Sequence, residues 1–127
     1  MEIKGTGDVK AKRGEKVTIN CAIDPLIYGN PTHVFVQWYH QNAEKQNTVK
    51  IWQASSLTQT NDAFNFFKDA NVTGSSAKLD VLKHGHNLTF HSIERQNRIY
   101  ICHIHVQLDN SFIQDYTSVN VLVKGRN

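Results

Sequence analysis

The chain has 127 residues, the size of one domain, and its 39% of apolar residues are enough to form a buried core. Charged residues make up 20% of the chain and the net charge of +3 is small. Basic and acidic residues are interleaved near the start: Glu2, Lys4, Asp8, Lys10, Lys12, Arg13, Glu15 and Lys16. A nucleic-acid-binding surface needs a denser basic stripe and a recognisable motif. We therefore interpret these residues as a solvated surface and expect no nucleic-acid partner.

The first half of the chain predicts short strands joined by polar turns. Residues 12–15 predict a turn in which Gly14 can adopt a positive φ. Residues 17–21 then alternate apolar and polar side chains, which is typical of a strand with one buried face. Residues 34–39 are β-branched and aromatic, and they alternate in the same way. Extended character resumes at residues 49–52, after a polar connection.

The second half continues the pattern after residues 55–76, whose Ser, Thr, Asn and Asp show no clear period. A turn is predicted at residues 84–87. Strands are expected at residues 77–81, 88–90, 99–106 and 119–123. No helix, internal repeat or linker is predicted. Eight or nine short strands separated by polar turns favour an all-β sandwich.

Two cysteines, Cys21 and Cys102, lie 81 positions apart. This spacing fits neither a four-ligand zinc site nor a Cys-x-x-Cys redox pair. A structural disulfide is a third possibility, which would stabilise the fold by about 4 kcal/mol and place it in an oxidising compartment. Asn71 and Asn87 begin N-glycosylation sequons, which point to the same compartment.

A tryptophan between the cysteines makes the spacing specific. Cys21, Trp38 and the segment Tyr100-Ile101-Cys102 match the Cys…Trp…Tyr-x-Cys pattern, and the chain resembles an immunoglobulin domain. The long interval between the cysteines leaves room for two extra strands and indicates the V type. Local matches support the resemblance at residues 38–41, 49–55 and 88–93.

The resemblance implies that residues 1–127 form a single V-type immunoglobulin β-sandwich. Its two antiparallel Greek-key sheets would contain about nine strands. A disulfide between Cys21 and Cys102 would join the sheets, and Trp38 would pack against it.

Within the family, residues 99–106 and 121–125 resemble the V domains of T-cell costimulatory and inhibitory receptors and of natural cytotoxicity receptors. The proline-rich third loop and the additional cysteines of the costimulatory receptors are missing. The joining-segment motif Phe-Gly-x-Gly-Thr is also missing, since residues 113–117 read Ile-Gln-Asp-Tyr-Thr. This argues against a rearranged antibody or T-cell receptor chain.

In V domains the sheet of strands G, F, C and C′ commonly binds partners. With Trp38 and Cys102 pointing inward, alternation points their neighbours outward, and Val49 and Trp52 are expected to join them from C′. A second candidate is the loop 107–116, which also contains Ile113 and Tyr116. The expected ligand-binding residues are Phe35, Gln37, Tyr39, Trp52, Ile101, His103, His105, Leu108 and Phe112. Alternatively, a β-bulge near Val49 shifts the alternation, and half of the loop side chains fold inward.

Seven histidines suggest a metal site, but the pairs His103 with His105 and His84 with His86 have no third ligand nearby. We therefore expect no metal and no cofactor. Histidines on a binding face would instead make binding sensitive to pH, because imidazole titrates near physiological pH. No catalytic constellation is recognisable, so we expect no enzyme.

Three functions remain. The first is the ectodomain of an immune-type cell-surface receptor that binds a protein ligand on another cell. The second is a coreceptor or adhesion domain that forms a homodimer through the same face. The third is a counter-ligand or a secreted or viral decoy. The cysteines, the sequons and the family resemblance lead us to expect an extracellular location, at the cell surface or secreted. No run of about 20 apolar residues is present, so any membrane attachment is expected through a segment outside this chain.

Overall fold

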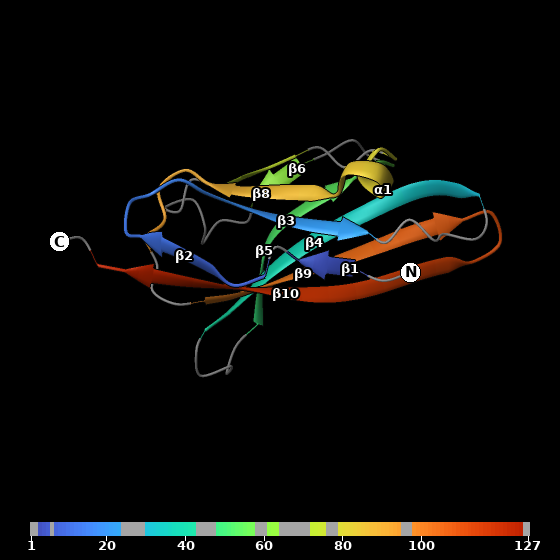
Figure 1. The fold of residues 1–127 in the computed structure, drawn as a ribbon. Helices are drawn as coiled ribbons and strands as arrows, with labels where there is room; N and C mark the ends of the chain where they lie inside the picture. The colour runs from blue at the N-terminus through green and yellow to red at the C-terminus, as the bar shows by residue number, and fades with distance from the viewer. Residues whose placement is uncertain are drawn as a thin grey trace.

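The computed structural model describes residues 3–5, 7–23, 30–42, 48–57, 61–63, 72–75, 79–94 and 98–125. These residues form ten strands and one helical turn, and the strands make two sheets packed face to face (Figure 1). The elements are β1 (Ile3–Gly5), β2 (Val9–Lys12), β3 (Val17–Ile23), β4 (Pro31–Asn42), β5 (Thr48–Ser55), β6 (Asn61–Ala63), β7 (Val72–Gly74), α1 (Val81–His84), β8 (His86–Phe90), β9 (Arg98–Leu108) and β10 (Phe112–Lys124). The predicted β-sandwich is confirmed.

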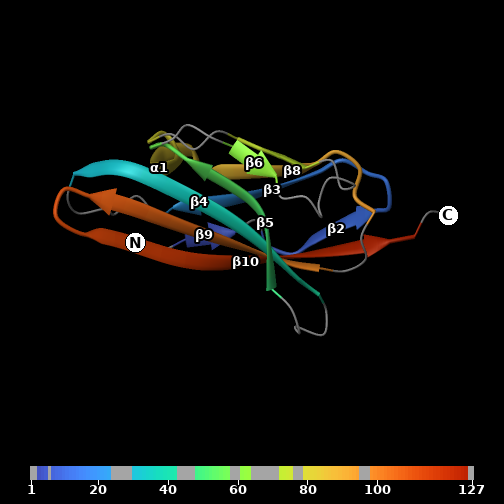
Figure 2. The same cartoon turned by 180° about the vertical axis from the view of Figure 1, so that it is seen from behind.

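One sheet has four strands in the order β1-β3-β8-β7, and the other has six in the order β2-β10-β9-β4-β5-β6. All pairings are antiparallel except that of β2 with β10, which is parallel. The first part of the chain therefore contributes a strand to each sheet, β1 to one and β2 to the other. Strands β5 and β6 extend the larger sheet at its far edge, where the two extra strands of a V-type domain were expected (Figure 2).

The core lies between the two sheets and follows the predicted alternation. On β3 the side chains of Val17, Ile19 and Cys21 are buried, whereas Thr18 between them is exposed. Cys21 and Cys102 form the expected disulfide, which joins β3 to β9 across the core. Trp38 is fully buried and is the register partner of Cys102 on the neighbouring strand.

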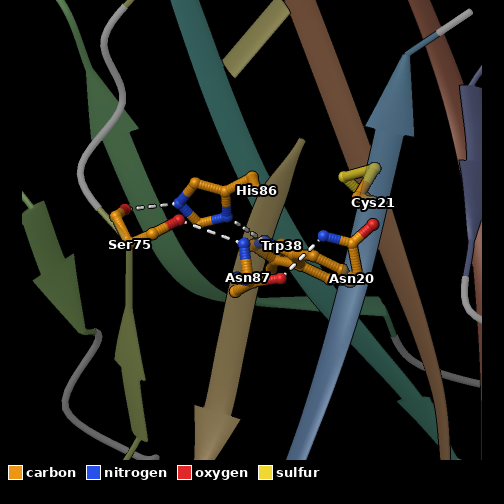
Figure 3. The surroundings of a disulfide bond; sticks show 7 residues. Asn20, Cys21, Trp38, Ser75, His86 and Asn87 are labelled. Carbon is orange, nitrogen blue, oxygen red and sulfur yellow. Dashed lines mark hydrogen bonds between the residues drawn. A yellow bond between two sulfur atoms is a disulfide. The ribbon is translucent and has the colours of Figure 1, made fainter. Parts of the chain in front are cut away.

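A buried histidine completes the core around the disulfide, with its ring between Ser75 and Trp38 (Figure 3). The indole Nε1–H of Trp38 donates to His86 Nδ1 at 2.9 Å. Because an indole can only donate, Nδ1 carries no proton, and the neutral ring has its proton on Nε2. Nε2 donates to the carbonyl oxygen of Ser75 at 2.6 Å. Both ring nitrogens are thus satisfied, as a side chain with no exposed surface requires.

Two predictions around His86 are wrong. Residues 84–87 are not a turn, because β8 already begins at His86. The expected strand at residues 77–81 is replaced, in its described part, by the approach to the helical turn α1. Gly85 ends that turn with a φ of 75° and lies close to the backbone of Cys21, so it places His86 directly in the sheet. A short alternating run does not distinguish a strand from a single helical turn.

Close packing of Trp52 on Gly74 generates one prediction. A Cβ atom added to Gly74 would lie 2.5 Å from the indole ring, which is far inside van der Waals contact. We expect Gly74→Ala to lower the free energy of unfolding by about 1–3 kcal/mol, the usual cost of overpacking. Gly125→Ala is the control, because its Cβ would meet no atom within 4 Å. Denaturant unfolding compares the two, and equal stabilities would contradict the packing.

The buried imidazole generates a second prediction. Burial lowers the pKa of His86 from 6.5 to about 4, and the hydrogen bond to Ser75 opposes this only in part. Because the unfolded chain binds the proton more readily, stability is complete above pH 6.5 and falls as the pH drops toward 4. The loss amounts to about 3 kcal/mol at 1.36 kcal/mol per pH unit.

Unfolding experiments between pH 7.5 and pH 4, in wild type and in His86→Asn, would measure this contribution. The variant cannot bind the proton, so its stability should fall less over the same range, even though it is less stable at pH 7.5. Parallel curves for the two proteins would show that His86 does not contribute to the acid sensitivity.

Candidate binding face

The side of the larger sheet that points away from the core is the candidate site. Along β9 every second side chain is buried, and on β4 Val34, Val36 and Trp38 are buried, so the residues between them point outward. On β10 the less exposed residues alternate with exposed ones in the same way. We call this surface the outer face and define it by Phe35, Gln37, Tyr39, Gln41, Lys50, Gln53, Ile99, Ile101, His103, His105, Phe112, Gln114, Tyr116 and Ser118. The strand register aligns them in rows, such as Tyr116, His103 and Gln37. The surface is continuous across four strands.

Five rings from three strands form two groups on the outer face, one of three rings and one of two. His105 stacks on Phe112 at 4.8 Å between ring centroids, and Phe35 meets the edge of His105 at 5.5 Å. His103 stacks on Tyr116 at 4.5 Å. Phe112 and Tyr116 keep 54% and 59% of their surface exposed. Cross-strand contacts of this kind hold large side chains in place while leaving their outer surface open.

Hydrogen bonds orient the polar side chains between these rings. The Tyr39 hydroxyl donates to Gln37 Oε1 at 2.8 Å, and His103 Nε2 lies 3.0 Å from Gln114 Oε1. Burial raises the pKa of Tyr39, and the nearby Tyr116 raises it further. The Tyr39 hydroxyl therefore keeps its proton at neutral pH and remains a donor.

The outer face carries little charge. Among its defining residues only Lys50 is a permanent ion, and its ammonium lies 5.9 Å from the centre of the Tyr39 ring. That distance is within the range of a cation–π contact. A shallow hollow beside Tyr116 is lined by Gln41, Ile99, Ile101, Tyr116, Thr117 and Ser118. A partner that covers this surface would have few charges to desolvate.

The structure places Trp52 in the core and not on the outer face, so that prediction is wrong. Only 5% of its surface is exposed. The register shifts between Trp38 and Tyr39, so that Trp38 pairs with Trp52 but Tyr39 pairs with Lys50. Ile51 is the extra residue of this bulge and is buried beside Trp52.

The bulge also changes which residue of β5 faces outward on the N-terminal side of Trp52. Lys50 is the register partner of the outward-facing Tyr39, whereas Val49 is the partner of the next residue, His40. The expectation that Val49 faces outward is therefore also wrong. The alternative interpretation, a bulge near Val49, is the one that the structure supports.

Leu108 and the loop 107–116 also require correction. Leu108 is 7% exposed and belongs to the core. Strand β9 continues to Leu108 and β10 begins at Phe112, so the connection is a short turn closed by the Leu108 N–H donating to Ser111 O at 2.8 Å. Phe112 and Tyr116 consequently lie on the sheet, while Ile113 packs against the core from the other side.

The structure brings together seven of the nine predicted ligand-binding residues: Phe35, Gln37, Tyr39, Ile101, His103, His105 and Phe112. The structure adds two residues to this set. Lys50 faces outward because of the bulge, and Gln114 lies on β10, where the sequence predicted a loop. Asn87 is exposed on β8, in the opposite sheet, and Asn71 lies outside the described residues. Within the described ranges, no three His, Cys, Asp or Glu side chains converge as metal ligands, and no helix has the length and apolar character to span a membrane.

Comparison with known proteins gives a family and a fold. The family model of the immunoglobulin V-set domain matches residues 4–123. A solved structure of murine CRIg superposes with a TM-score of 0.72 over 97% of each chain. The two sequences are 16% identical, so this likeness concerns the fold alone. No curated protein matched the sequence significantly.

Proposed function

The chain belongs to the immunoglobulin V-set family, and we propose that it is an extracellular recognition domain of an immune-type cell-surface receptor. Its role would be binding and not catalysis, with a protein on another cell as the ligand. The Cys21–Cys102 disulfide supports an extracellular location, because such bonds persist in oxidising compartments. The outer face is the proposed binding surface.

The contrast between the two sheets carries this proposal. The exposed side of the smaller sheet presents small polar side chains that pair with one another, Thr18 with Thr89 at 2.9 Å and Asn20 with Asn87 at 2.6 Å. The outer face instead presents exposed aromatic rings with little charge. Large rings with few rotatable bonds are enriched at binding hot spots, and charged side chains are depleted there. A glycan on Asn87 would stand on the smaller sheet and leave the outer face open.

A second copy of the chain is the alternative ligand. Gln37 and Gln53 are cross-strand partners on the outer face, and Gln41 lies four residues further along β4. An amide side chain both donates and accepts hydrogen bonds. Such groups can pair with their own symmetry mates across a two-fold axis. This function would use the same surface for a homodimer.

Cell binding by the purified domain tests the proposal. A multimer of the domain would first identify cells that it stains, and labelled monomer would then be titrated on those cells. Tyr39→Ala and Phe112→Ala should each weaken binding by about 2 kcal/mol or more, as expected for hot-spot residues. That loss is roughly 30-fold in dissociation constant.

Thr18→Ala and Thr89→Ala are the matched controls, since they change the opposite sheet and should leave binding unaltered. Thermal unfolding of each variant would confirm that it is folded. The proposed face would be wrong if the controls lost binding while Tyr39→Ala retained it. Light scattering of the pure domain distinguishes the homodimer, which Tyr39→Ala should dissociate.

A further inference from the structure

A second surface lies at the other end of the larger sheet. Strand β2 and the C-terminal end of β10 lie side by side there, away from the β9–β10 turn (Figure 2). A hollow at this place is lined by Lys10, Ala11, Lys12, Glu15 and Lys124. We call it the cationic hollow. Lys124 lies eight residues beyond Tyr116 on the same strand, about 26 Å at 3.3 Å per residue, so the hollow is separate from the rings of the outer face.

The strand register brings the three lysines together from distant parts of the sequence. Lys12 and Lys124 are direct partners across the parallel pair, and Lys10 follows on the same side of β2. Like charges placed directly opposite each other destabilise a sheet. All three side chains are exposed, and Glu15 is the one acidic residue in the lining. Three positive charges and one negative charge leave the hollow with a surplus of two.

The backbone around the hollow is held in place by hydrogen bonds. The N–H of Arg13 donates to Lys124 O at 2.8 Å, and the N–H of Glu15 donates to Lys12 O at 3.0 Å. Ile93 fastens the turn from the other side, since its carbonyl accepts from Gly14 at 2.6 Å and its N–H donates to Glu15 O at 2.9 Å. A ligand would therefore meet positions that are already ordered, which lowers the entropic cost of binding.

Protection of a sheet edge explains only part of this arrangement. Lysines on an edge strand prevent pairing with another chain, and β2 is such a strand. That role accounts for Lys10 and Lys12. Beyond Val121, β10 is paired with β2 alone, so Lys124 also lies beside an open edge. Edge protection does not require Lys124 to stand directly opposite Lys12, where like charges destabilise the pair. A third cation that faces Lys12 repels it and is stabilised by an anion between them.

We propose that the cationic hollow binds sulfate groups of an extracellular polysaccharide. The complementary charge identifies an anion, and the choice of a polysaccharide rests on the proposed extracellular function. Lys10 and Lys12 are about 6.6 Å apart along the strand, so the hollow can hold successive charges of a chain. Lysine acts on such groups as a point charge, which tolerates variation in their geometry.

Binding of the purified domain to immobilised heparin, measured by surface plasmon resonance at 0.15 M salt, tests the proposal. The double variant Lys12→Gln with Lys124→Gln should weaken binding roughly tenfold and flatten its dependence on salt, because two charge contacts are lost. Lys50→Gln with Lys83→Gln changes the net charge equally at distant sites and should bind almost as wild type. Glu15→Gln, which removes the negative charge from the hollow, should bind more tightly.

Three results would overturn the proposal. The first is an equal loss in both double variants, which would mean a response to net charge alone. The second is unchanged heparin binding in Lys12→Gln with Lys124→Gln together with increased self-association, which would leave edge protection as the role of the lysines. The third is equal binding to single-stranded DNA with the same dependence on these residues, which would exclude selectivity for a sulfated polysaccharide. Tyr39→Ala should bind heparin normally, so failure of the outer face and failure of the hollow are distinguishable.

Discussion

The pairing of buried Trp38 with the disulfide-bonded Cys102 determines which side chains the larger sheet can present. It fixes one residue on β4 and its register partner on β9 with their side chains inward. Because side chains alternate along a strand, the residues immediately before and after each of them must then face outward. The aromatic rings of the outer face are exposed because the core holds these two strands in one register, and a slip by one residue would bury them.

The hydrogen bonds of His86 show that this core accepts one protonation state of a buried ring. Its ring accepts from Trp38 on one side and donates to Ser75 on the other, so one tautomer fits and the charged form does not. A polar residue in this position orients the indole beside the disulfide, at the cost of acid sensitivity. The sequence alone offered no sign of this role, because His86 lies beside Gly85 among polar residues that are typical of a turn.

The β-sandwich and most of the outer face were predictable because period-2 alternation is a local property of the sequence and the Cys…Trp…Cys spacing can be counted along it without knowledge of the strand pairing. Trp52 was mispredicted because one bulge residue, Ile51, reverses the alternation on β5, and a bulge depends on pairing with β4. Leu108 was predicted to lie in a loop because polar residues follow it. In the structure the alternation of β9 continues to Leu108, and β10 begins already at Phe112.

Strand β10 relates the two proposed surfaces to each other. It carries Phe112 and Tyr116 near one end and Lys124 at the other, and its pairing with β9 and β2 makes it part of one continuous sheet. A polysaccharide held at the cationic hollow would leave the rings uncovered, because about 26 Å of strand separates Tyr116 from Lys124. Weak attachment through charge would then raise the local concentration of the outer face near a cell surface. The two contacts would differ in their response to salt, since binding through the hollow depends on screened charges and binding through the rings depends on buried apolar area.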